Sequence, residues 1–288
     1  MLTTRGLRIF MGLTTNLLLA CALAAACAPS ARAGQAGGPE AGRAVSAAAL
    51  LAALKQAGSE MTPAKESARD EAVESLKRLG REAVPAIEEF LNREKGPARV
   101  YAAEALAGIE PSNALARRTL SEAAGEGGGD EVIAAAAALA EVDPENDAAV
   151  PQLVKMASKT IILPSAKNMR RMRGAAFALA LTAPGVRALT PLLNHWDSWV
   201  RQSAVFAFDE RTEAMAHATP AVRAAVMEAI PALVKDLADK DEVVRGVAAE
   251  VLEQLGPEAV PELEKAAAGG DRKSAPAAAE LLKRVGRR

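Results

Sequence analysis

A histidine, an aspartate and a serine lie within four residues of one another at His195, Asp197 and Ser198, and these are the side-chain types of a serine-hydrolase triad. A working triad needs three separated side chains joined by hydrogen bonds around a substrate. Residues packed into one turn cannot reach that geometry. The sequence also contains no Gly-x-Ser-x-Gly elbow. We therefore assign no nucleophilic catalysis to this segment.

Residues that could bind a metal or a phosphate are equally scarce. The chain has two histidines, His195 and His217, and only Asp197 accompanies the first of them. Zinc sites take three or four closely spaced ligands, so we interpret His195 as an ordinary turn residue. The glycine-rich segment 125–129 lacks the Lys and Ser or Thr of a phosphate-binding loop. We expect neither an enzyme nor a bound cofactor.

The elements that hold these residues are expected to be helices. Hydrophobic residues form 50% of the chain but aromatic residues only 3%, so the apolar content is mainly Ala, Leu and Val. Ala and Leu favour helices, and the nearest approach to a strand, residues 160–163, is too short for a sheet. The class is therefore all-α. A net charge of −1, with basic and acidic residues interspersed, does not favour binding to nucleic acid.

The first 33 residues resemble a bacterial secretory signal. Two arginines precede an uncharged, mainly apolar run over 9–28, and Ala-Arg-Ala at 31–33 forms a small-x-small cleavage pattern. Cleavage there would begin the mature chain at Gly34, followed by a flexible linker over 34–43. We expect export to the periplasm or the outside of the cell.

Two alternatives for the N-terminus stay open. The sequences that end at Cys21 and Cys27 each resemble the lipobox of bacterial lipoproteins, which would give a lipid anchor. The apolar run over 9–28 could also span a bilayer uncleaved. Cleavage after Ala33 would remove both cysteines, and a thiol-free chain cannot form wrong disulfides in an oxidising compartment.

Internal repeats are the most informative feature of residues 44–288. The segment LGREAVPAIE at 79–88 recurs as LGPEAVPELE at 255–264, and eight of the ten positions are identical or exchange Ile for Leu. A third copy begins at Asp271. We expect a single helix near 45–55 followed by about six helix pairs, each joined by a tight turn.

Glycine and proline mark the turns of these pairs. Gly80 and Gly256 stand where a helix ends in a left-handed residue, and Pro85 and Pro261 fall in the first turn of the next helix.

The middle of the chain has a longer period. Pro151, Pro191 and Pro231 are 40 residues apart and predict the starts of three further second helices, with inserted residues around 159–167 and at 211–219. The segment 125–129 predicts a loose hinge that interrupts the stacking.

A second pattern begins at Asp197 and Asp241, each followed by x-x-Val and then by Arg201 or Arg245. Together with the glycine and proline turns it resembles the HEAT family, especially the bacterial HEAT-like repeats related to phycobilisome lyases, over about 61–286. The resemblance implies a right-handed α-solenoid of stacked antiparallel helix pairs. It also implies that these aspartates and arginines form a structural ladder of polar bonds between repeats.

The resemblance implies a scaffold or adaptor that binds a protein or peptide on the concave surface of its second helices. The candidate contacts on these helices are Glu89, Lys155, Arg187, Lys235 and Glu262. Their mixed charge fits a polar protein or peptide groove. The alternative is a lyase-like or chaperone role, which would need a tetrapyrrole site, and the sequence offers neither a mature cysteine nor clustered histidines for one. A passive spacer is a third alternative.

The two tryptophans are the sharpest candidates. Alignment of the two Asp-x-x-Val-Arg units places Trp196 opposite Lys240, which predicts an exposed position, either a partner contact or a lid over a neighbouring helix. It places Trp199 opposite Val243, which predicts a packed position.

Overall fold

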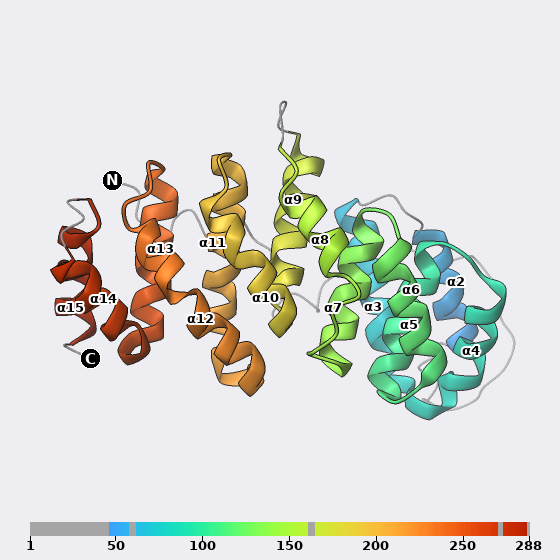
Figure 1. The fold of residues 1–288 in the computed structure, drawn as a ribbon. Coiled ribbons are helices and arrows are strands. Elements are labelled where there is room, and N and C mark those ends of the chain that lie inside the picture. The colour runs from blue at the N-terminus through green and yellow to red at the C-terminus, as the bar shows by residue number, and fades with distance from the viewer. Residues whose placement is uncertain (1–45, 58–61, 161–164, 270–272, 287–288) are drawn as a thin grey trace, which may run out of the picture. The chain divides into compact units, whose positions relative to one another are not determined.

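A computed structural model describes residues 46–57, 62–160, 165–269 and 273–286, and all secondary structure in these ranges is helical (Figure 1). The all-α prediction is confirmed. The predicted signal at 1–33 and the linker at 34–43 lie outside the described residues. Within the described ranges, no helix combines the length and the apolar character needed to cross a membrane.

The described helices form six pairs between α2 (Ala47–Ala57) and α15 (Ala275–Val285), as the repeats predict. The first helices of the pairs are α3 (Pro63–Leu79), α5 (Pro97–Ile109), α7 (Asp130–Val142), α9 (Ala166–Leu179), α11 (Ser198–Glu213) and α13 (Glu242–Leu255). The second helices are α4 (Val84–Arg93), α6 (Ala114–Glu126), α8 (Val150–Ala157), α10 (Ala183–Leu189), α12 (Pro220–Asp236) and α14 (Val260–Ala268). Short 3₁₀ helices are η1 (Gly80–Ala83), η2 (Thr190–Asn194), η3 (Met215–His217) and η4 (Gly256–Ala259).

The pairs stack in chain order. Each first helix packs against the first helix of the next pair, from α3 through α13 to α15, and the second helices from α4 to α14 pack in the same sequence. The succession can be followed by colour in Figure 1. Stacking of this kind, in which contacts are made mainly with neighbours, is the architecture of an α-solenoid, so the predicted fold class is confirmed.

Glycine turns join the two helices of the first pair and those of the sixth pair in the same way. Gly80 follows α3 with φ 61° and Gly256 follows α13 with φ 63°, a region that favours glycine because it has no Cβ. Pro85 and Pro261 lie in the first turns of α4 and α14, where a missing backbone N–H costs little. The sequence repeat is therefore also a repeat of backbone conformation.

Small side chains fill the layer of first helices. In α5 the residues Ala102, Ala103, Ala105 and Leu106 are fully buried. Alanine faces let neighbouring helices approach closely, so the interior needs few aromatic rings. This accounts for the low aromatic content of the chain.

Two of the middle prolines do not start a second α-helix, which corrects the prediction. Pro151 lies in the first turn of α8, but Pro191 lies in η2, after α10, and Pro231 lies inside the unbroken α12. A proline inside a helix removes one backbone hydrogen bond. The buried side chains of Val226 and Ile230 continue the apolar stripe of α12 up to that point, and their packing offsets the loss.

Of the two expected insertions, the one around 159–167 lies partly outside the described residues, and the one at 211–219 is partly helical. Residues 211–213 complete α11, and η3 occupies part of the connection to α12. Residues 127–129 connect α6 and α7 as expected, although Gly125 belongs to α6. The expected interruption of the stacking is wrong, because α5 packs against α7 and α6 packs against α8. The side chain of Gln152 donates a hydrogen bond to the carbonyl of Gly125 (3.3 Å), which ties this end of α6 to α8.

Candidate partner-binding site

Trp196 lies in the connection from η2 to α11, and Trp199 lies in the first turn of α11. Trp196 is 70% exposed and Trp199 is 41% exposed, and they are the large hydrophobic side chains that the described residues expose to solvent. The expected exposure of Trp196 is confirmed, and the aligned Lys240 is exposed too. The expected burial of Trp199 is wrong.

The first turn of α11 explains the position of Trp199. Asp197 is the N-cap, so Trp199 is the second residue of the helix. The buried stripe runs through Val200 and Ala204, and Trp199 lies about 100° around the helix from Val200, at the edge of that stripe. The aligned Val243 is half-buried as well, but a large indole at this position leaves much more of its surface in solvent.

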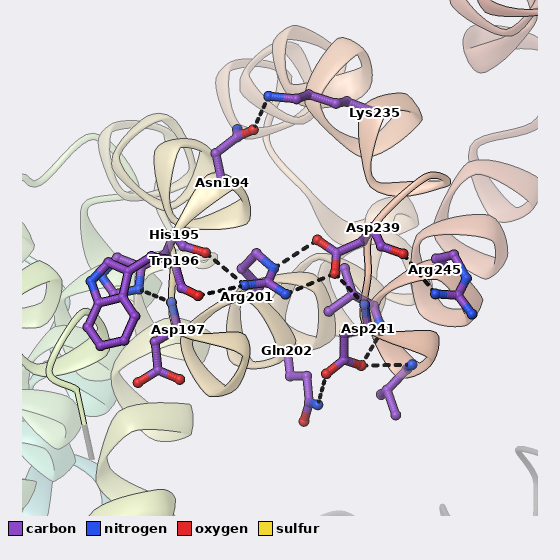
Figure 2. A network of polar contacts seen from close by, with 12 residues as sticks. Asn194, His195, Trp196, Asp197, Arg201, Gln202, Lys235, Asp239, Asp241 and Arg245 are labelled. Atoms are coloured by element: carbon purple, nitrogen blue, oxygen red, sulfur yellow. Dashed lines mark hydrogen bonds and ion pairs between the residues drawn. The ribbon is translucent and has the colours of Figure 1, made fainter. Parts of the chain in front are cut away.

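Arg201 holds the connection that carries Trp196. Its guanidinium is buried, and Nη1 donates to the carbonyls of His195 (2.9 Å) and Trp196 (3.1 Å). Nε and Nη2 donate to the two carboxylate oxygens of Asp239 at 2.8 and 2.9 Å (Figure 2). A bidentate pair of this kind is both strong and geometrically specific. The backbone at Trp196 is therefore fastened to the connection that precedes α13.

Further hydrogen bonds cap α11 and α13 and link the two helices. The carboxylates of Asp197 and Asp241 each accept a hydrogen bond from the backbone N–H two residues on, which caps α11 and α13. Gln202 donates to the second oxygen of Asp241 (2.9 Å), and Arg245 donates to the carbonyl of Asp239 (2.7 Å). The predicted ladder of polar bonds between repeats is confirmed between α11 and α13.

The ladder includes two residues that the sequence analysis missed. Asp239, the carboxylate partner of Arg201, lies outside the repeated Asp-x-x-Val-Arg pattern, and Gln202 follows the arginine of that pattern. An acidic residue two positions before the N-cap Asp241 was the available signal for Asp239.

His195 supports the connection through its ring. Its ring stacks on that of Trp196, with centroids 5.5 Å apart and an angle of 30° between the planes. Its Nδ1 accepts a hydrogen bond from the backbone N–H of Asp197 (3.2 Å), while the Asp197 carboxylate caps α11. No group of three or more His, Cys, Asp or Glu residues placed to hold a metal occurs in the described ranges.

A buried carboxyl lies near the ion pair of Arg201 with Asp239. Asp236, at the end of α12, is only 3% exposed, and its Oδ2 has no hydrogen-bond partner among the described residues. Burial raises the pKa of Asp236 to about 7, and the negative charge of Asp239 acts in the same direction, against the opposing charges of Arg201 and Lys235. Near neutral pH this carboxyl titrates.

Two of the predicted contact residues join neighbouring repeats. Arg187 of α10 forms an ion pair with Glu228 of α12 (Nε to Oε2, 2.9 Å). Lys235 of α12 donates to the side chain of Asn194 (2.6 Å), just before the connection that carries Trp196 (Figure 2). Lys235 is therefore the predicted contact residue that reaches the tryptophan site.

The other predicted contacts remain apart from this site. Glu89 pairs with Arg93 within α4, and Glu262 pairs with Lys265 within α14. Lys155 is exposed on α8. These residues belong to three different second helices, so they do not form one cluster with Trp196.

Comparisons with known proteins concern the fold. No protein-family model and no curated protein sequence matches this chain. A crystal structure of an engineered protein is 20% identical, covers 83% of this chain and 68% of its own, and has a TM-score of 0.38. A designed armadillo repeat protein in complex with the peptide (KR)4 is 18% identical, with coverages of 81% and 99% and a TM-score of 0.34.

A third similar structure is the complex of CpcE and CpcF of phycocyanin lyase from Nostoc sp., with 19% identity, coverages of 89% and 100%, and a TM-score of 0.34. Similarity at this level carries no argument about activity or partners. The architecture itself is clear from the stacked pairs, the glycine turns, and the aspartate caps and arginine that link repeats. In fold, the described part of the chain is a HEAT-like repeat solenoid.

Proposed function

We propose that this protein is an exported bacterial scaffold or adaptor that binds a protein or peptide partner, and that Trp196 and Trp199 form the centre of the contact. The observation that carries the proposal is the exposure of both tryptophans on a connection held by the buried Arg201. No catalytic step is part of this function.

Exposed tryptophans on a fixed backbone suit binding. Exposing an indole to water is unfavourable, so a folded protein gains free energy when a partner covers it. Tryptophan is also over-represented among the residues that dominate binding energies. Because Arg201 already fixes the backbone at Trp196, little conformational entropy is lost on association.

The surrounding second helices would extend the contact. Arg187 of α10 and Lys235 of α12 each contact the neighbouring repeat. Polar groups on more distant second helices are Glu89, Lys155 and Glu262. Their mixed charge suits the periphery of an interface, where polar side chains remain partly solvated.

A binding experiment tests the role of the tryptophans. The full chain with a C-terminal affinity tag would be used to capture partners from a cell-envelope fraction, and the affinity of the captured partner would then be measured. Trp196→Ala should weaken binding about 30-fold, equivalent to ~2 kcal/mol, without lowering the melting temperature. Lys155→Ala is the matched control on another helix. Equal affinity of Trp196→Ala and the unchanged protein would rule out Trp196 as the contact.

Export is supported by the sequence of residues 1–33 and is tested separately. Intact-mass measurement of the protein recovered from the cell envelope should give a chain that begins at Gly34. A lipid-modified Cys21 or Cys27 would replace soluble export by a lipid anchor.

A further inference from the structure

The helix beside Trp199 is basic. α9 carries Lys167, Arg170, Arg171 and Arg173 and has no acidic residue. It packs directly against α11, whose first turn contains Trp199 (Figure 1). A positive face next to an exposed indole offers two kinds of contact to one ligand.

Two of these cations are engaged inside the fold. Arg171 forms a bidentate pair with Asp130 of α7, at 3.0 and 3.4 Å. The guanidinium of Arg173 lies over the ring of Phe206, 5.2 Å from its centre. Burial lowers the pKa of Arg173, and the charge of Glu210 partly opposes this effect.

The other two cations differ in exposure, and the Nε of Arg170 is buried without a hydrogen-bond partner among the described residues. Lys167 is exposed and Arg170 is half-buried, and within the described ranges neither side chain forms an ion pair. An acidic group of a ligand would therefore supply the negatively charged partner that these two cations lack among the described residues.

The packing of α9 on α11 places Lys167 near the level of Trp199, with Arg170 about one turn further along α9. The contact between Arg173 and Phe206 places these two residues at neighbouring positions along the two helices, which are both first helices of their pairs and run in the same direction. Trp199 lies seven residues before Phe206, on the same face of α11 and about 10 Å along its axis. Lys167 lies six residues before Arg173, about 9 Å along α9.

We infer that the face formed by Lys167, Arg170 and Trp199, here called the α9–α11 face, binds an acidic peptide segment of the partner. The inference rests on the proposed function and adds the chemistry of the ligand. Carboxylates of the segment pair with the two cations, and an apolar side chain between them covers the indole of Trp199. Charge selects the segment, and burial of the indole supplies most of the affinity.

The chain contains two tryptophans, Trp196 and Trp199, so its intrinsic fluorescence reports this site directly. The probes are three synthetic peptides of about 12 residues that share the same leucines: one with Glu and Asp, one with Lys and Arg, and one with Ser and Asn. The acidic peptide should shift the emission to shorter wavelength with saturation. The basic and neutral peptides should bind at least ~10-fold more weakly, and added salt should weaken the acidic peptide. The variants Trp196→Phe and Trp199→Phe assign the shift to one indole.

Charge variants complete the test. Lys167→Glu, at an exposed position, and Arg170→Gln should each weaken the acidic peptide about 10-fold while helical content is unchanged. Lys155→Glu, the same charge reversal on the exposed face of α8, should have no effect. Equal binding of acidic and neutral peptides, no emission shift with any peptide, or equal weakening by Lys167→Glu and Lys155→Glu would each overturn the inference.

The same variants separate this inference from the proposed function. If capture of the cellular partner depends on Trp196 but is unchanged by Lys167→Glu, the tryptophan contact stands and the acidic ligand is wrong. If capture is unchanged by both Trp196→Ala and Trp199→Ala, the proposed function itself fails.

Discussion

Arg201→Ala would remove a buried guanidinium that donates four hydrogen bonds across two connections. The variant leaves the Asp239 carboxylate without its charge partner, and it leaves the carbonyls of His195 and Trp196 without their donor. Breaking a buried ion pair by removing one member costs about 3–5 kcal/mol, because the remaining charge is desolvated and uncompensated. We expect a loss of this size in the free energy of unfolding of the repeats that contain α11 and α13.

Arg245→Ala is the matched control. Arg245 occupies the same position of the repeated pattern, but it is half-buried and donates one hydrogen bond, to the carbonyl of Asp239. Losing one such bond costs about 1 kcal/mol. The double variant Arg201→Ala with Asp239→Ala should be more stable than Arg201→Ala alone, because it removes the carboxylate that Arg201→Ala leaves unpaired at position 239.

Urea unfolding followed by both tryptophan fluorescence and circular dichroism would measure these differences. Fluorescence reports the repeat around α11, and circular dichroism reports all helices, so local loss can be told from global loss in a protein whose repeats unfold in part independently. If Arg201→Ala and Arg245→Ala lower the free energy of unfolding equally, the buried hydrogen bonds and ion pair of Arg201 contribute less to stability than their geometry implies.

Three further outcomes are expected. Because burial raises the pKa of Asp236 from 3.8 to about 7, the folded protein binds this proton more tightly than the unfolded chain does, so the contribution of Asp236 to stability should fall by at most ~4 kcal/mol as pH rises from about 4 to about 7. Asp236→Asn should flatten that dependence in pH-resolved urea titrations, and an unchanged slope would contradict the assignment. Trp196→Ala should change the free energy of unfolding by less than ~0.5 kcal/mol, whereas Trp199→Ala should cost about 1–2 kcal/mol, and thermal melts showing equal losses would contradict this order. Asp241→Ala should cost about 1 kcal/mol through the loss of the α13 cap, and unchanged unfolding of the C-terminal repeats would show that the cap adds nothing.

Local chemistry made much of the fold predictable. The composition indicated an all-α chain, and the repeated glycine and proline turns located the first and last helix pairs, because a turn glycine and a first-turn proline act on the backbone of their own residues. Prediction was weaker in the middle repeats. Pro231 lies within a helix because buried neighbours outweigh one missing hydrogen bond, and that balance depends on packing.

The features of the candidate site also divide into those set by nearby residues and those set by tertiary packing. The sequence by itself determined that Trp196 stands at an exposed turn and that Asp197 and Asp241 cap helices, since these properties depend on residues a few positions away. Only the tertiary structure decided that Arg201 bonds Asp239, 38 residues on, and that the basic helix α9 packs against α11, the helix that carries Trp199. Those pairings depend on the register in which successive repeats stack, and the register follows from the packing of buried side chains between helices.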